Sequence, residues 1–282
     1  MIRRLGIMQG RMVPPTGGRI QCFPRDDWAA EFPLAARAGL ASIEWIYDAY
    51  GADVNPIATD EGVAAMLRLQ REHGVSVVSV CADLFMDRPL LRAPQDEIES
   101  RLQVLWWLMT RSALLGIERI ILPFVDASRI ETPHEADQVV SVLRSAATAA
   151  RNLGIELHLE TSLGPAPFRD LLDRLPDTVF RVNYDVGNSA SLGFDPRDEF
   201  AAYGPRIGSI HIKDRVLGGG TVPLGTGDAD LPAVFRGLHA LDYSGDVILQ
   251  VARGHPGDEV AWAARNAAFV RDALARHSGH PA

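Results

Sequence analysis

The sequence predicts an α/β protein that folds as a single (β/α)8 TIM barrel over residues 1–282. Eight short apolar segments alternate with eight longer amphipathic segments along the whole chain, which is the pattern of repeated βαβ units in a parallel sheet. The length of 282 residues is close to the roughly 250 residues of a complete barrel. No linker or low-complexity segment interrupts this alternation.

The expected strands are short and several are almost continuously apolar, as is typical of parallel strands covered on both faces. They span 4–9, 42–47, 75–81, 119–125, 155–160, 180–185, 207–213 and 246–252. A doubly wound open sheet is the alternative, but its first strand usually leads into a glycine-rich phosphate-binding turn. Here the first strand leads into GRMVPPTGG, which does not match GxGxxG, so the barrel is favoured.

The expected helices begin at acidic or hydroxyl residues and several end at glycine, the usual start and stop signals. Asp26 and Asp27 should open the first helix, Thr59 should cap the second, and Gly74 should end it. The helices are expected at 26–39, 59–74, 94–116, 133–154, 167–175, 196–204, 231–241 and 258–276. Residues 275–282 are expected to form a frayed tail.

Charge and composition restrict the partners. The formal net charge is −8 and no basic block is present, which argues against binding to nucleic acid or to anionic lipid. The two cysteines, Cys22 and Cys81, offer no disulfide framework. There is no signal-peptide pattern and no run of 18 apolar residues. We therefore expect a cytoplasmic protein with a small-molecule partner.

Polar residues gather where the expected strands end, and in a barrel these ends share one mouth. Glu160, Asp185 and His211 end or lie near the end of three consecutive strands. Two carboxylates and an imidazole that converge there would repel or desolvate one another unless a cation neutralised them. Their oxygen and nitrogen atoms suit Mn²⁺, Mg²⁺, Co²⁺ or Zn²⁺. The alternative is that they are separate polar residues lining a wet mouth.

Other residues near the mouth have two interpretations each. His158 has the same strand parity as Glu160, and we expect it to be a deeper, hydrogen-bonded core residue. The loop KDRVLGGGTVPLGTGDAD begins with Lys213 and contains Arg215 and many glycines. It could hold a phosphate or carboxylate, or it could be a flexible lid.

Seven segments resemble the sugar-phosphate isomerase/epimerase superfamily, the xylose-isomerase-like barrels, with a relation to ketose 3-epimerases. They are GIMQGR (6–11), AGLASIEWI (38–46), HLET (158–161), NYDVGNSASLG (183–193), SIHIKDR (209–215), PLGTGDAD (223–230) and VILQVAR (247–253). The resemblance implies a Mn²⁺-type ion held by Glu160, Asp185 and His211, with Gln250 in the fourth place. It also implies a homo-oligomer, a dimer or a tetramer.

The sequence departs from the family pattern at two of these places. Gln250 stands where the ketose 3-epimerases have a second glutamate, and an amide can coordinate a metal but cannot abstract a proton. Asn188 stands where many members have a substrate-binding histidine. The symmetric two-base scheme of those epimerases therefore does not carry over to this chain directly.

The expected function is a metal-dependent isomerase or epimerase of a ketose or ketose phosphate, with proton transfer through an enediolate. Glu160 would be ligand and general base. Glu44 would be the second acid/base and contact substrate, or else form a salt bridge to Arg11 or Arg253. The remaining substrate-binding candidates are Asn188 for a sugar hydroxyl, Lys213 and Arg215 for a distal anion, and Arg253.

Three rival functions deserve comparison. A metal-dependent keto-sugar or cyclitol dehydratase would share the metal and the base. A non-catalytic sugar-binding barrel would fit the neutral Gln250. A repair endonuclease would need extra histidines on the early strands, and the first four expected strands have none.

Overall fold

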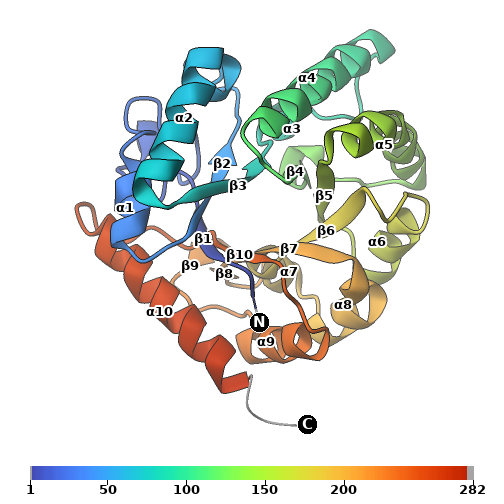
Figure 1. Cartoon of the computed structure of the whole chain (residues 1–282). Helices are drawn as coiled ribbons and strands as arrows, with labels where there is room; N and C mark the ends of the chain where they lie inside the picture. Colours follow the sequence, from blue (N-terminus) through green and yellow to red (C-terminus); the bar gives the residue numbers. More distant parts are fainter. Residues whose placement is uncertain (1, 278–282) are drawn as a thin grey trace.

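Eight parallel strands close into a barrel in the computed structural model, which describes residues 2–277 (Figure 1). The order around the barrel is β1-β10-β7-β6-β5-β4-β3-β2, and the pairing of β1 with β10 closes it. This confirms the predicted (β/α)8 barrel. The barrel strands are β1 (Leu5–Met8), β2 (Ser42–Ile46), β3 (Ser76–Cys81), β4 (Arg119–Phe124), β5 (Glu156–Thr161), β6 (Phe180–Asp185), β7 (Ile207–Ile212) and β10 (Asp246–Leu249).

Helices form the outer layer and cover the apolar outer face of the strands (Figure 1). The helices of residues 2–277 are α1 (Glu31–Arg37), α2 (Asp60–His73), α3 (Leu84–Asp87), α4 (Gln95–Leu114), α5 (Pro133–Leu153), α6 (Pro165–Leu172), α7 (Val186–Leu192), α8 (Pro196–Tyr203), α9 (Leu231–Ala240) and α10 (Glu259–His277). Single 3₁₀ turns lie at Thr16–Gly18, Pro56–Ala58, Asp126–Ser128 and Gly204–Arg206. No helix within residues 2–277 has the length and apolar composition needed to cross a membrane.

The predicted helix signals hold for α2. Thr59 accepts a hydrogen bond from the Gly62 N–H, and Gly74 ends the helix with a left-handed φ of 65°, a conformation that glycine adopts without a Cβ penalty. The first helix was predicted wrongly, because α1 begins at Glu31 and not near Asp26. Pro33 explains the difference, since proline lacks an N–H and is tolerated only in the first turn of a helix.

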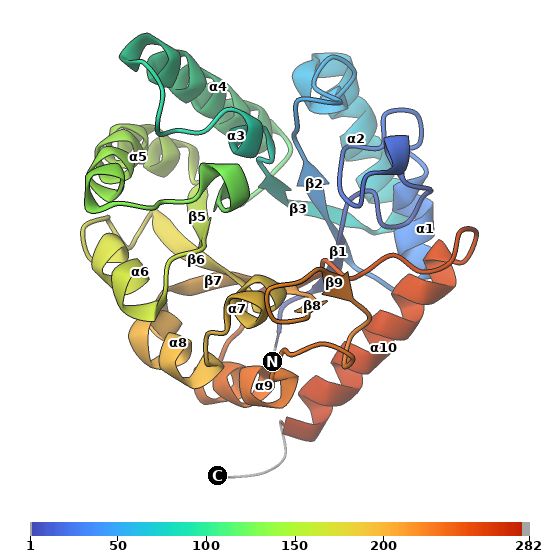
Figure 2. The same ribbon diagram turned by 180° about the vertical axis from the view of Figure 1, so that it is seen from behind.

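Two short helices and one hairpin were not predicted. The helices are α3 and α7, and the hairpin pairs β8 (Asp214–Arg215) with β9 (Thr221–Val222). Figure 2 shows α7 and the hairpin together at the end of the barrel where the strands have their carboxyl ends. Of the expected frayed tail, residues 275–277 belong to α10, and the rest lies outside the described residues.

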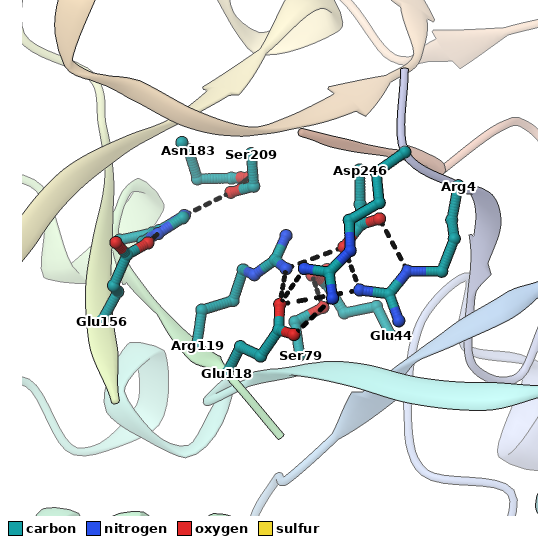
Figure 3. A network of polar contacts seen from close by, with 12 residues as sticks. Arg4, Glu44, Ser79, Glu118, Arg119, Glu156, Asn183, Ser209 and Asp246 are labelled. Atoms are coloured by element: carbon teal, nitrogen blue, oxygen red, sulfur yellow. Dashed lines mark hydrogen bonds and ion pairs between the residues drawn. The ribbon is translucent and has the colours of Figure 1, made fainter. Parts of the chain in front are cut away.

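A charged cluster occupies the opposite, amino-terminal end of the barrel (Figure 3). Asp246 is fully buried and accepts hydrogen bonds from Arg4 at 2.8 and 3.0 Å and from Arg119 at 2.7 Å. Glu118 pairs with Arg3 and Arg119. Because these charges satisfy one another, we assign the cluster to stability, which is the usual role of this end of the barrel.

Candidate metal centre

Glu160, Asp185 and His211 converge at the carboxyl ends of β5, β6 and β7. Asp185 and His211 are direct partners in the β6–β7 register. One ligand atom from each of the three residues can be chosen so that all lie within 4.8 Å of one another, and all three side chains are buried. The predicted convergence of these three residues is therefore present in the structure.

The atoms that face one another suit a cation. His211 Nδ1 lies 3.3 Å from Glu160 Oε2 and 3.8 Å from Asp185 Oδ2. Asp185 Oδ2 is buried and lies 2.7 Å from Lys213 Nζ, so this carboxylate oxygen already faces a positive charge. Two carboxylate oxygens and one imidazole nitrogen form a donor set that divalent Mn, Zn or Co accepts. The three residues therefore fit a metal ion.

Glu44 lies behind His211 and sets its orientation. Glu44 Oε1 is 2.5 Å from His211 Nε2, and Ser79 Oγ donates to Glu44 Oε2 at 2.6 Å (Figure 3 labels Glu44 and Ser79). A proton on Nε2 leaves Nδ1 directed at Glu160 and Asp185. Carboxylates that bind the far nitrogen of a metal-ligating histidine commonly fix its tautomer in this way.

The centre attracts positive charge. Burial lowers the pKa of His211, but Glu44, Asp185 and Glu160 outweigh burial and raise that pKa well above its usual value. Burial likewise raises the pKa of Asp185, but Lys213 and His211 outweigh it and lower the pKa below the usual range. The centre thus favours the ionised form of Asp185 next to positive charge.

A second polar layer lies one step deeper in the barrel. His158, Asn183 and Ser209 each precede a candidate ligand by two residues on the same strand, so they share its inward face. His158 is buried and bonds Ser209 Oγ at 2.7 Å and Glu156 at 2.9 Å. This confirms the prediction of a hydrogen-bonded core histidine, and burial lowers its pKa.

Two asparagines hold Glu160. Asn183 Nδ2 donates to Glu160 Oε2 at 2.9 Å, and Asn188 Nδ2 donates to Oε1 at 2.7 Å. Ser209 Oγ donates to the Asn183 carbonyl at 2.7 Å, and Arg215 Nη1 donates to the Asn188 carbonyl at 2.8 Å. Each asparagine therefore has its side-chain carbonyl bound by a neighbour and its NH₂ directed at Glu160, and the Asn183 NH₂ also lies 3.1 Å from His211 Nδ1.

Lys213 and Gln250 lie beside Asp185. Lys213 Nζ is 2.7 Å from Asp185 Oδ2 and donates to Gln250 Oε1 at 2.7 Å. The lysine stem crosses close to the start of α7, where a Cβ on Gly187 would lie 2.8 Å from Lys213 Cγ. The ammonium therefore occupies the side of the centre that faces Gln250.

The predicted substrate-binding residues all have polar partners inside the protein. Glu44, Asn188, Lys213 and Arg215 bond the residues described above, and Arg215 also binds the Gly219 carbonyl. Arg253 donates to the carbonyls of Gly10, Val13 and Ile20. Arg11 likewise binds the carbonyls of Val251 and Ile20. The alternative of a salt bridge from Glu44 to Arg11 or Arg253 is therefore wrong in this structure.

The glycine-rich loop after β7 is fixed by one carboxylate. Asp214 is fully buried and accepts from the N–H groups of Gly225, Gly227 and Ala229 at 2.8, 3.0 and 3.2 Å. These backbone donors are therefore not free for a phosphate or carboxylate ligand in this conformation.

Comparison with known proteins places the chain in a family. Residues 32–273 match the family described as xylose isomerase-like TIM barrel. The protein belongs to this family, and the resemblance noted in the sequence is confirmed, together with the expectation of an enzyme of the sugar isomerase and epimerase group.

Curated relatives share about a quarter of their residues with the chain. It is 28% identical over 226 residues to 2-epi-5-epi-valiolone 7-phosphate 2-epimerase of Actinoplanes sp., which covers 79% of this chain and 77% of the relative. It is 26% identical to a putative L-ribulose-5-phosphate 3-epimerase of Escherichia coli, over 67% and 69% of the two chains. It is 28% identical to an inosose dehydratase of Geobacillus kaustophilus, over 44% and 49%.

Solved structures support the fold. An L-ribulose 3-epimerase superimposes with a TM-score of 0.77 at 17% identity, covering 98% of this chain and 96% of the other. The IOLI protein, solved with a bound zinc atom, has a TM-score of 0.74 at 16% identity over 98% and 100% of the two chains. At these identities the likeness shows the shared barrel and nothing finer.

Proposed function

We propose that this protein is a metal-dependent isomerase or epimerase of a ketose or ketose phosphate that moves a proton at the carbon next to a carbonyl. The observation that carries the proposal is the buried convergence of Glu160, Asp185 and His211, with Glu44 directing His211 Nδ1 into the centre. The names of the two epimerase relatives point to the same chemistry on sugar phosphates and their cyclic analogues.

Glu160, Asp185 and His211 would hold the ion, with the Gln250 carbonyl as a fourth ligand. We favour Mn²⁺, and Mg²⁺, Co²⁺ and Zn²⁺ remain alternatives because availability as well as donor type selects the metal. A divalent ion bound there supplies positive charge that stabilises the negative charge developing on the substrate oxygens.

Glu160 would accept the proton. Its carboxylate is ordered by the NH₂ groups of Asn183 and Asn188, so its orientation is set before substrate arrives. Asn188 and Arg215 would act through Glu160, because Arg215 donates to the Asn188 side chain and Asn188 donates to the glutamate. We assign Glu44 to positioning His211, since it is fully buried and both its oxygens have partners.

An isomerase needs one such base, whereas an epimerase needs a donor on each face of the carbon. Gln250 cannot be that second donor, because a neutral side-chain amide neither gives a proton to a carbon atom nor takes one from it. A dehydratase acting on a keto-sugar or cyclitol is a second candidate, favoured by the inosose dehydratase relative. A dimer or tetramer is a further prediction for this protein.

The test is a panel of ketoses and ketose phosphates incubated with the Mn²⁺-loaded protein in D₂O. We expect deuterium at the carbon next to the carbonyl of at least one compound, and product analysis then separates epimerisation, isomerisation and loss of water. Glu160→Gln should reduce exchange by about 10²–10⁴-fold, while Glu72→Gln, an exposed glutamate on α2, should not change it. Full exchange by Glu160→Gln would contradict the proposal.

A further inference from the structure

A chain of hydrogen bonds crosses the barrel mouth through four side chains. Gln21, from the loop between β1 and α1, donates through Nε2 to Asp83 Oδ2 at 2.8 Å. Gln250 Nε2 donates to Gln21 Oε1 at 3.0 Å. Lys213 Nζ donates to Gln250 Oε1 at 2.7 Å. The chain thus links the ends of β3, β10 and β7 and includes a loop residue that no sequence signal had marked.

The two ends of this chain fix its direction. An ionised carboxylate only accepts hydrogen bonds and an ammonium group only donates them. With Asp83 at one end and Lys213 at the other, both amides between them must point the same way. Burial raises the pKa of Asp83 to about 6, so the carboxyl is ionised above about pH 7.

Arg11 reinforces the same direction. Its Nη2 lies 3.2 Å from Gln21 Oε1, and a guanidinium group has no acceptor. If the Gln21 amide turned over, its NH₂ would face Arg11 and its carbonyl would face Asp83. Because Asp83, Lys213 and Gln250 are all at most 9% exposed, water cannot readily satisfy groups that are paired wrongly.

We propose that Gln21 is a positioning residue that holds the Gln250 amide with Oε1 directed at Lys213, whose ammonium also contacts Asp185 of the candidate metal centre. The pair explains why an amide stands at position 250. A carboxylate at position 250 would place an acceptor against Gln21 Oε1. The Gln21 amide cannot rotate to offer its NH₂ instead, because it would then lose its hydrogen bond to Asp83 and direct its NH₂ at the Arg11 guanidinium. The orientation of Gln250 follows from the contacts alone, and its role as a metal ligand rests on the proposed function.

A double-mutant cycle of Gln21→Met and Gln250→Glu tests the orientation. Unfolding by urea is measured in EDTA at about pH 8. Each single change should raise the unfolding equilibrium constant. Gln21→Met removes the hydrogen bonds of Gln21, and Gln250→Glu places a carboxylate oxygen against Gln21 Oε1, so that two acceptors face each other. In the double variant the methionine removes the opposed carbonyl. The fold increase in the unfolding equilibrium constant of the double variant should therefore be about 10-fold smaller than the product of the two single-variant increases. A difference of this size lies within the range measured for residues in contact.

A matched cycle provides the control. Gln103→Met, at an exposed position on α4, combined with Gln250→Glu should give the product of the single effects within about twofold. The same product for Gln21→Met with Gln250→Glu would overturn the proposal. If Gln250→Glu alone does not fold, recovery of a cooperative melt in the double variant supports the proposal, and failure to recover it overturns it.

Calorimetric titration with Mn²⁺ separates this inference from the proposed function. Gln21→Met should weaken Mn²⁺ binding by about 10-fold, the scale found when a residue that orients a ligand is removed. Coupling in the cycle without Mn²⁺ binding to the wild type would refute the metal centre and leave the Gln21–Gln250 alignment standing. Mn²⁺ binding without coupling would refute the alignment and leave the metal centre standing.

Discussion

Glu44→Gln removes the charge behind His211 while keeping the size of the side chain. Glu44 and His211 are both fully buried and their facing atoms are 2.5 Å apart, so the full effect of the charge falls on the imidazole. A glutamine can still accept from Nε2 through its carbonyl, with Ser79 as partner for its NH₂. The imidazole orientation should therefore persist with a less basic Nδ1, and we expect Mn²⁺ affinity to fall by about 10–100-fold.

The assay is Mn²⁺ titration by calorimetry, followed by kinetics at rising Mn²⁺ concentration. If Glu44 acts through His211, saturating Mn²⁺ should restore most of kcat. If Glu44 were instead the second proton donor, kcat would stay low at saturation. Glu199→Gln is the control, since Glu199 is buried and bonds Tyr184, Ser189 and Tyr203, none of which is a candidate metal ligand. Unchanged Mn²⁺ affinity in Glu44→Gln would refute the reasoning.

Three further predictions concern stability. Asp246→Asn leaves the buried Arg119 and the half-buried Arg4 with a weakened partner, and urea unfolding should show a loss of up to about 3–5 kcal/mol, whereas no loss would mean that the cluster is not stabilising. Burial raises the pKa of Glu31 from 4.5 to about 7, so its protonated form stabilises the fold at low pH and this contribution is lost as the pH rises. Relative to Glu31→Gln, wild-type stability should fall by up to about 3 kcal/mol between pH 4.5 and 7, and parallel pH profiles would contradict the shift. Asp214→Asn should loosen the loop 223–230 and speed its cleavage by a protease under native conditions, with equal cleavage rates as the contrary result.

The barrel was predictable because its signal repeats. Each strand is a short apolar run, and the helices carry start and stop residues. An error in the bounds of one element therefore does not change the predicted number of strand–helix units. Local errors came from competing chemistry. Pro33 delays α1 to Glu31, and α7 follows β6 without a loop because Asp185 itself accepts from the Asn188 N–H and caps the helix.

The three candidate ligands were predictable from strand order, because consecutive strand ends in a barrel are neighbours. The layer beneath them was predictable in principle by the same parity. Asn183 and Ser209 lie two residues before Asp185 and His211, as His158 lies before Glu160, and only the histidine was considered.

Side-chain contacts across the barrel could not be predicted from strand order or residue parity. Glu44 faces His211 across 167 positions of sequence, and Gln250 meets Gln21 across 229. Nothing in strand parity says whether a buried carboxylate turns toward substrate or toward an imidazole. That choice is made by the neighbouring donors, here His211 Nε2 and Ser79 Oγ, which only the assembled barrel brings together.

The most direct test of the central claim is anomalous diffraction at the manganese edge from crystals grown with Mn²⁺. We predict one strong peak at the mouth, about 2.0–2.2 Å from Glu160 Oε2, Asp185 Oδ2 and His211 Nδ1, with His211 Nε2 still on Glu44. A crystal saturated with Mn²⁺ that shows no peak among these three side chains, or a peak bound through Nε2, would contradict the account.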